Sequence, residues 1–283
     1  MNQQADIIFT DEQAQLLEIA ETFTANKSPM DAVRRQLEAE DAIEAGLWQE
    51  IAGLGWLGIA VPEEYGGSGL GLGEVVTIVE PMGRNLFSSP LISTTIAAQM
   101  ILLGGTEAQK SRWLPQLAGG TVAALALTEA HGDWDLTNLT CTAARRNGDR
   151  LVLSGGKTFV TDARLAEMFL VSAALDGSPA LVIVEASDLG PGALSREVVI
   201  DESRRSHALN LDGISVAKDN LLGAANLHRL HLAACLLYAA EVCGGTAGVI
   251  NVTLDYLTTR RQFGQFIGAY QALKHPMVDA LVG

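Results

Sequence analysis

Residues 260–271 combine the side-chain types that an adenine dinucleotide requires. Arg260 carries a planar guanidinium with a fork of donors suited to phosphate, and Gln262 and Phe263 follow it with an amide and an aromatic face. Gln271 lies on the helical pattern that comes next. A cation in the last turn is also common at an ordinary helix end. These residue types alone therefore leave open both a nucleotide contact and a plain helix C-terminus.

Glu241 is the one charged side chain between His231 and Asp255. The apolar run around it, residues 232–250, is close to the length of a membrane span. A carboxylate at the centre of a span costs roughly 2.5–3.5 kcal/mol on insertion scales, so we expect the central helix of a helical bundle instead. A carboxylate inside an apolar helix suits a general base, and it equally suits a structural pair with an arginine.

The bulk composition excludes several classes of partner. The chain has 283 residues, of which 19 are Lys or Arg and 33 are Asp or Glu, which gives a net charge of −14. Such an acidic chain argues against nucleic acids and anionic membranes as partners. Cys141, Cys235 and Cys243 fit no metal-ligand spacing and indicate reduced thiols. With no basic leader at residues 1–13, we expect a cytoplasmic protein without a metal site.

The hydrophobic pattern divides the chain into three regions. Residues 1–120 show helical periodicity, starting at Thr10 with Gln13 three residues later as a capping box. Residues 121–226 contain seven short apolar runs, at 122–127, 150–153, 158–160, 168–173, 180–184, 197–200 and 208–211. Turn signals at Asn147-Gly148, Asp176-Gly177 and Asp212-Gly213 separate some of these runs. Residues 227–283 are helical again. The pattern predicts an α+β protein with a middle antiparallel sheet, small barrel or sandwich between two helical domains.

Five short motifs lie along nearly the whole chain. In chain order they are Pro62-Glu-Glu-Tyr-Gly-Gly, Gly105-Thr-Glu with Trp113-Leu-Pro115, Thr128-Glu129, Lys157-Thr-Phe-Val-Thr161, and Arg260-x-Gln262-Phe263-Gly264. Each motif is weak alone, but together and in this order they make the chain similar to the acyl-CoA dehydrogenases. The resemblance implies an incomplete C-terminal helical bundle, because family members carry further helices beyond the point where this sequence stops.

The resemblance also implies an activity and its site. Family members bind FAD and desaturate acyl-CoA thioesters in fatty acid or steroid side-chain β-oxidation: a base takes the α-proton and flavin N5 takes the β-hydride. Thr128, Phe159 and Thr161 match flavin contacts, while Arg260, Gln262, Phe263 and Gln271 match residues that reach a neighbouring subunit's FAD. An oligomer, homomeric or heteromeric, and an electron-transfer flavoprotein as electron acceptor are therefore expected. An oxidase of the acyl-CoA or nitroalkane type is the alternative in which O₂ is the acceptor.

Two departures from the family pattern bear on function. A gap-free count places one common position of the family's catalytic glutamate on Ala234, and Glu241 lies two helical turns later on roughly the same face, so we take Glu241 as the candidate base. The phosphate loop carries Asp133-Trp134 where the family has Gly-Ser, and an acidic side chain there would repel a pyrophosphate. The alternative is therefore a catalytically silent subunit that completes the FAD site of a partner chain.

Overall fold

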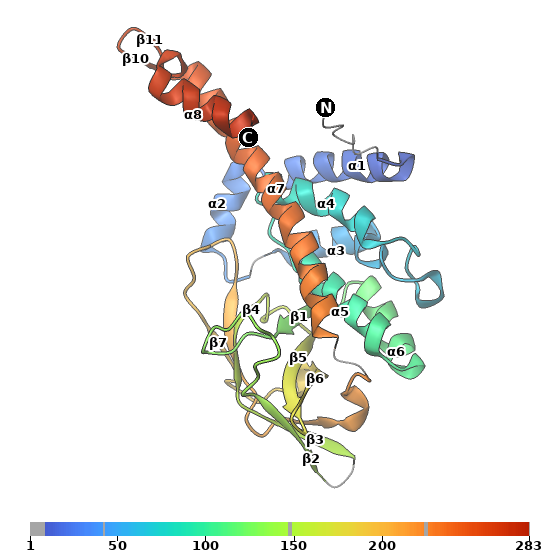
Figure 1. The fold of residues 1–283 in the computed structure, drawn as a ribbon. Helices are drawn as coiled ribbons and strands as arrows, with labels where there is room; N and C mark the ends of the chain where they lie inside the picture. The colour runs from blue at the N-terminus through green and yellow to red at the C-terminus, as the bar shows by residue number, and fades with distance from the viewer. Residues whose placement is uncertain (1–8, 42, 147–148, 224–225, 283) are drawn as a thin grey trace, which may run out of the picture.

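The computed structural model describes residues 9–41, 43–146, 149–223 and 226–282 (Figure 1). Six α-helices come first, at Asp11–Lys27 (α1), Met30–Glu38 (α2), Ala45–Gly53 (α3), Leu72–Arg84 (α4), Leu91–Gly104 (α5) and Glu107–Ala118 (α6). Thr10 caps α1 and Thr106 caps α6, each with a glutamine three residues later that closes a capping box. The capping box predicted at Thr10 is confirmed, because its hydroxyl accepts a hydrogen bond from Gln13 N at 3.1 Å.

The β-region follows the helices. Its strands are Ala123–Ala126 (β1), Thr142–Arg146 (β2), Arg150–Ser154 (β3), Gly156–Thr161 (β4), Met168–Leu175 (β5), Ser178–Glu185 (β6), Leu194–Arg196 (β7), Ser206–Asn210 (β8) and Ser215–Ala217 (β9). One sheet has the order β1-β5-β2-β3-β9, with β6 paired to β5, and a second has the order β4-β8-β7. The predicted α+β architecture is confirmed, and these strand paths do not close into a barrel.

The strand predictions differ from the structure in three respects. The β5 strand pairs in parallel with both β1 and β2, so the sheet is mixed and not purely antiparallel. The run at 197–200 is not a strand: Val198 and Ile200 are fully exposed there, and the strand lies earlier, at β7. The polar β2 and the short β9 lack the apolar alternation that would have predicted them.

Of the three predicted turns, two lie within the described residues. Asp176 and Gly177 both have positive φ, at 51° and 77°, and join β5 to β6 as a two-residue hairpin. Asp212-Gly213 forms the turn between β8 and β9, with Gly213 at φ 77°. The turn predicted at Asn147-Gly148 falls outside the described residues.

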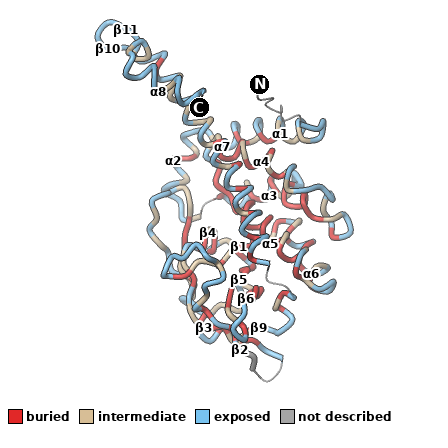
Figure 2. Tube along the Cα trace, in the orientation of Figure 1, coloured by how far each residue is buried: buried red, intermediate tan, exposed pale blue. Residues whose placement is uncertain are grey.

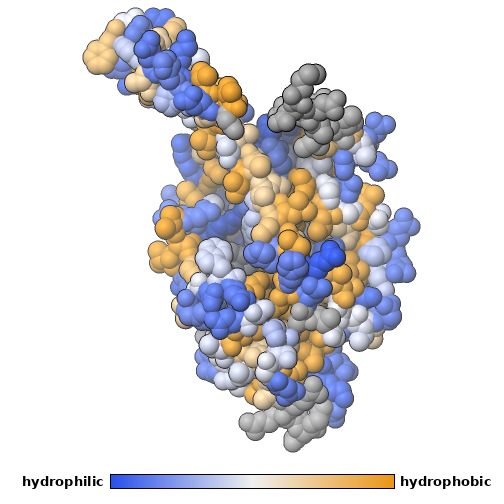
Figure 3. Space-filling view, viewed as in Figure 1, coloured by the Kyte–Doolittle hydropathy of each residue, from blue (hydrophilic) through white to orange (hydrophobic). Residues whose placement is uncertain are grey.

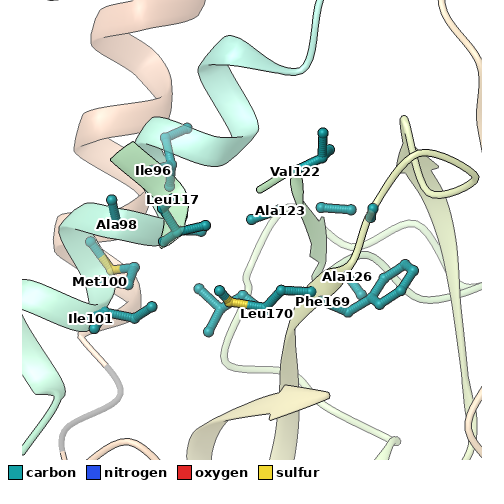
Figure 4. Packing of buried hydrophobic residues seen from close by; sticks show 14 of the residues in the cluster. Ile96, Ala98, Met100, Ile101, Leu117, Val122, Ala123, Ala126, Phe169 and Leu170 are labelled. Atoms are coloured by element: carbon teal, nitrogen blue, oxygen red, sulfur yellow. The ribbon is translucent and has the colours of Figure 1, made fainter. Parts of the chain in front are cut away.

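The hydrophobic core joins the first helices to the larger sheet. Figure 4 shows Met100 and Ile101 of α5 with Leu117 of α6 on one side, and Ala123 of β1 with Leu170 of β5 on the other. All five side chains are at most 2% exposed. Figure 2 shows the same pattern along the trace, with buried residues concentrated in α4, α5, β1 and β5. This shared core fixes the helices against the strand ends that carry the site.

The last elements of the chain are a long helix and a short segment, residues 260–282, which we call the arm. The helix α7, Leu227–Thr259, lies against α4, and then the strands Arg261–Gln262 (β10) and Gln265–Phe266 (β11) form a hairpin followed by Gln271–Val282 (α8). The hairpin and α8 lie beside the C-terminal end of α7 and project with it away from the β-sheets (Figure 1). Within the described residues, α7 is the one helix that is long and apolar enough to cross a membrane, a finding that rests on length and composition only.

Candidate active site

A bulge in β4 presents Phe159 and Thr161 outward. Lys157 and Val160 are both buried although they are three residues apart, and the β4–β8 register shifts between them. Phe159, within the bulge, has φ +54° and is 58% exposed, an unusual backbone conformation for an aromatic residue. Thr158 N donates to Thr128 O at 2.9 Å, so the structure brings the segments of Thr128, Phe159 and Thr161 together.

Glu197 of the β7–β8 connection holds this bulge. Its carboxylate accepts hydrogen bonds from Phe159 N at 2.9 Å, from Ser206 Oγ at 2.7 Å and from the Thr158 hydroxyl. Burial raises the pKa of Glu197, but these donors outweigh burial and leave its pKa below the usual range. Nothing in the sequence marked Glu197, because the contact joins residues 38 positions apart.

A buried ion pair lies beneath the same two segments. Lys157 Nζ is 2.7 Å from Glu129 Oε1, and the two side chains are 0% and 3% exposed. Lys157 also donates to Ser172 Oγ at 3.0 Å, and Glu129 accepts from Cys141 N at 3.0 Å. Burial raises the pKa of Glu129, but the hydrogen bonds from Lys157, Thr140 and Cys141 outweigh burial and lower this pKa to about 2. The pair therefore fixes the residues adjoining Thr128 and Phe159.

Glu241 faces a polar cavity of about 260 Å³ between α5, the end of β4 and α7. The lining residues are Ser89, Ile92, Ser93, Thr161, Asp162, Asp201, Arg204, Tyr238 and Glu241. Arg204 forms an ion pair with Glu241, and their side chains are 21% and 19% exposed. The structure thus supports both sequence interpretations of Glu241, since it lines a cavity and is paired with an arginine.

Asp162 and Arg204 are the two charged cavity residues closest in role to Thr161 and Glu241 among the seven lining residues that the sequence did not predict. Asp162 is 3% exposed, and burial raises the pKa of its carboxyl to about 6. Its position directly after Thr161 is the one signal that could have singled it out. Arg204 is 37 residues from Glu241 in sequence, and no local pattern connects the two.

The arm carries the other four predicted site residues, and it lies at the far end of α7 from β4 (Figure 1). Arg260 ends α7, while Gln262 and Phe263 lie on the hairpin and Gln271 begins α8. Phe263 and Gly264 have φ +52° and +84° and form the two-residue turn, with Phe263 93% exposed. Within one chain the structure does not bring these residues to Thr128, Phe159 and Thr161.

The loop at Asp133 and Trp134 is acidic and exposed. Trp134 is 91% exposed, and Asp133 accepts hydrogen bonds from Asn138 Nδ2 at 2.7 Å and Asp135 N at 2.9 Å. The bond from Asn138 and that from Asp135 hold the pKa of Asp133 below its usual range, so the loop stays anionic at neutral pH. The three cysteines are free thiols, and no cluster of metal-ligand type occurs among the residues that the structure describes.

Comparison with known proteins identifies the family. Residues 10–121 match the acyl-CoA dehydrogenase N-terminal domain, and residues 124–209 match the acyl-CoA dehydrogenase middle domain. A solved steroid ACAD, Tcur3481–Tcur3483, has 33% sequence identity and a TM-score of 0.85 over 95% of this chain and 73% of that chain. The chain belongs to the acyl-CoA dehydrogenase family.

Two further comparisons show how much of a known protein this chain covers. Acyl-CoA dehydrogenase FadE12 of Mycobacterium tuberculosis is 32% identical over 251 residues, 82% of this chain. The chain spans only 63% of the length of that relative. A solved structure described as the electron transferring flavoprotein of Acidaminococcus fermentans has 27% identity and a TM-score of 0.82 over 97% of this chain and 75% of that chain.

Proposed function

We propose that this chain forms the flavin and acyl-CoA sites of an FAD-dependent acyl-CoA dehydrogenase in which Glu241 is the base. The observation that carries the proposal is that Glu241 and Thr161 line one cavity. A thioester whose α-carbon lay in that cavity would have a carboxylate on the α7 side. The hydride acceptor would lie on the opposite side of the thioester, against the β4 strand that holds Phe159 and Thr161.

The β4 face suits the ring system of a flavin. Phe159 offers an exposed aromatic surface, and the half-buried Thr128 and Thr161 lie beside it with hydroxyls that donate and accept hydrogen bonds. Bound FAD would supply the acceptor for the hydride from the β-carbon. Phe159 has an unfavourable positive φ, and the hydrogen bond from its N–H to Glu197 stabilises this conformation. A strained residue that its surroundings hold in place is typical of a binding site, which supports a role of Phe159 in flavin binding.

Glu241 would accept the α-proton once a thioester fills the cavity. Its partner Arg204 holds the carboxylate in the cavity wall and keeps it from turning toward solvent. Both groups are largely withdrawn from water, which strengthens their interaction and excludes side reactions. Arg204 is therefore a positioning residue in this proposal, because it acts through Glu241.

Substitution of Glu241 by glutamine tests the assignment of the base. The Glu241→Gln variant should keep its visible flavin spectrum and lose bleaching of that spectrum on anaerobic addition of an acyl-CoA, by at least about 10³-fold in rate. Glu202→Gln, on the exposed segment beside the cavity, is the matched control and should react like the wild type. Retained bleaching in the Glu241→Gln variant would exclude Glu241 as base.

The alternative function is a silent subunit that completes another chain's FAD site. The exposed, anionic Asp133 loop favours it, because a pyrophosphate would meet a like charge there. The projecting arm also favours it, because Arg260 and Phe263 lie where a second chain could receive them. Purification of the chain alone tests this alternative: a flavin near one per chain contradicts it, whereas a colourless protein that becomes yellow only with a co-expressed partner supports it.

The oligomer and the electron acceptor belong to the same proposal. Apolar side chains gather along α7 on the surface seen in Figure 3, and those exposed by the C-terminal half of the helix include Val249, Val252 and Tyr256. An apolar surface of this kind suits a subunit contact. An electron-transfer flavoprotein is the proposed acceptor, supported by the similarity to the Acidaminococcus fermentans structure. Loss of turnover when this acceptor is replaced by O₂ would separate a dehydrogenase from an oxidase.

A further inference from the structure

Asp162 is a buried carboxylate without a hydrogen-bond partner among the described residues, although the positive charges of Arg204 and Arg205 act on it. It is 3% exposed, its Oδ1 has no hydrogen-bond partner, and no hydrogen bond or ion pair to its carboxylate occurs among the described residues. An unsatisfied buried polar group costs about 1–3 kcal/mol, and more when it is charged. Its backbone has φ +57°, a conformation that aspartate and asparagine tolerate better than most side chains, so this angle adds little cost. An unsatisfied carboxylate in a cavity wall points to a ligand that donates a hydrogen bond to it.

Several other polar groups of the cavity are already satisfied within the chain. Glu241 is paired with Arg204, and Asp201 accepts from Ser203 N at 3.0 Å and from Ser203 Oγ at 2.6 Å. Ser93 Oγ donates to Pro90 O at 3.0 Å. Asp162 is therefore the one carboxylate of the cavity that has neither a hydrogen bond nor an ion pair among the described residues, and a ligand that donates to it gains a contact that the chain does not supply. The hydroxyls of Thr161 and Tyr238, which have no hydrogen bond there either, offer further contacts.

The lining also restricts the size and charge of that ligand. Of the nine lining residues, Ile92 is the one aliphatic side chain, so a plain alkyl chain would desolvate polar groups without compensation. The volume of about 260 Å³ falls below the 300–1,000 Å³ of sites for drug-sized ligands, so this cavity suits a short group, and a second cavity of about 180 Å³ shares Asp201, Arg204 and Glu241 with it. Asp162, Asp201 and Glu241 outnumber Arg204, so an acyl group that ends in a carboxylate would be repelled.

We propose that the cavity selects a short acyl group that carries a hydrogen-bond donor, a hydroxyl or a protonated amine, and that Asp162 accepts this donor. The inference rests on the proposed function, because the acyl group enters the cavity as part of a CoA thioester next to Glu241. Asp162 is then a specificity-determining residue of the substrate site, and the cost of its burial is offset only when the correct substrate is bound.

Binding of unreactive CoA thioethers to the purified chain tests the proposal without turnover. S-pentyl-CoA, S-(4-hydroxypentyl)-CoA and S-(4-aminopentyl)-CoA are compared by calorimetry. The wild type should bind one of the two donor-bearing probes at least tenfold more tightly than S-pentyl-CoA. In Asp162→Ala the three dissociation constants should agree within about threefold, with the S-pentyl-CoA value unchanged.

The conservative variant Asp162→Asn identifies which donor is recognised. Asparagine tolerates positive φ and keeps an acceptor oxygen but removes the charge. Retained preference in this variant assigns the donor as a hydroxyl, whereas loss of preference assigns it as an ammonium group.

Four results would overturn the proposal. They are a wild-type preference for S-pentyl-CoA, equal wild-type binding of all three thioethers, an undiminished donor preference in Asp162→Ala, and loss of the bound flavin's absorbance in Asp162→Ala, which would assign Asp162 to the flavin. If none of the three thioethers binds, the proposed function itself fails, whereas binding of all three without discrimination refutes only the role of Asp162.

Discussion

Gly83 of α4 packs directly against the backbone of Glu241 on α7. A Cβ atom built on Gly83 would lie 1.9 Å from the carbonyl oxygen of Glu241, a separation that no real side chain tolerates. The absence of a side chain at residue 83 therefore allows the two helices to approach closely enough to place Glu241 in the cavity wall. The position of the candidate base thus depends on a residue of a different helix.

A second glycine on α7 gives a direct test of this helix crossing. A Cβ on Gly244 would lie 1.8 Å from Glu80 O, so Gly244→Ala should force the helices apart and destabilise the protein by about 1–3 kcal/mol or more. A Cβ on the adjacent Gly245 meets its nearest atom at 3.6 Å, an ordinary contact. Gly245→Ala is therefore the matched control and should be neutral or stabilising in urea unfolding. Equal stability of the two variants would refute the close crossing.

The buried Lys157–Glu129 pair should show strong coupling. Lys157→Met leaves the carboxylate of Glu129 buried without its cation, and we expect a loss of about 3–5 kcal/mol in the free energy of unfolding. Glu129→Gln should cost a comparable amount, because it leaves the ammonium unpaired. The double variant should lose much less than the sum of the single changes in a double-mutant cycle. Additive losses would show that the two charges do not depend on each other.

Acid should destabilise the protein partly through Glu129. Its pKa in the folded protein is about 2, below the ordinary 4.5, so its contribution is complete above pH 4.5 and is lost as the pH falls toward 2. The difference corresponds to about 3 kcal/mol. Unfolding in urea between pH 5 and pH 2.5 should therefore show a smaller acid-induced loss in Glu129→Gln than in the wild type. Glu21→Gln, on the exposed surface of α1, should retain the wild-type loss.

Residues close together in sequence were predictable where one local rule determined their structure. Thr10 and Gln13 form a capping box because both partners lie within one helical turn, and Asp176-Gly177 forms a hairpin because the turn itself requires positive φ. The continuous apolar runs of β5 and β6 likewise reflect burial of both strands. Each of these features depends on a few consecutive side chains, so a pattern in the sequence was enough.

The candidate site was less predictable because its contacts join distant residues. Arg204 meets Glu241 across 37 positions, and Glu197 meets Phe159 across 38. The bulge that turns Phe159 outward also breaks the two-residue alternation on which strand prediction depends. The absence of a hydrogen-bond partner for Asp162 is a property of the folded surroundings, and no motif in the sequence indicates it.

Phe159 should show a conflict between stability and flavin binding. Phe159→Gly relieves the positive φ of a largely exposed side chain, so the protein without flavin should be equally stable or more stable by about 1 kcal/mol. The same change removes the aromatic surface proposed for the flavin ring and should weaken flavin binding at least tenfold, measured by equilibrium dialysis. Unchanged flavin affinity would remove Phe159 from the site.

Phe263→Gly provides the matched comparison and also distinguishes the two proposed functions. Phe263 has nearly the same backbone strain, with φ +52°, and is 93% exposed, but it lies on the projecting arm. The gain in stability should therefore be similar in the two variants. If identical chains complete each other's sites, Phe263→Gly should also weaken flavin binding by the purified chain. If the arm serves a different chain, flavin affinity of the chain alone should not change, and only the co-expressed complex should lose flavin.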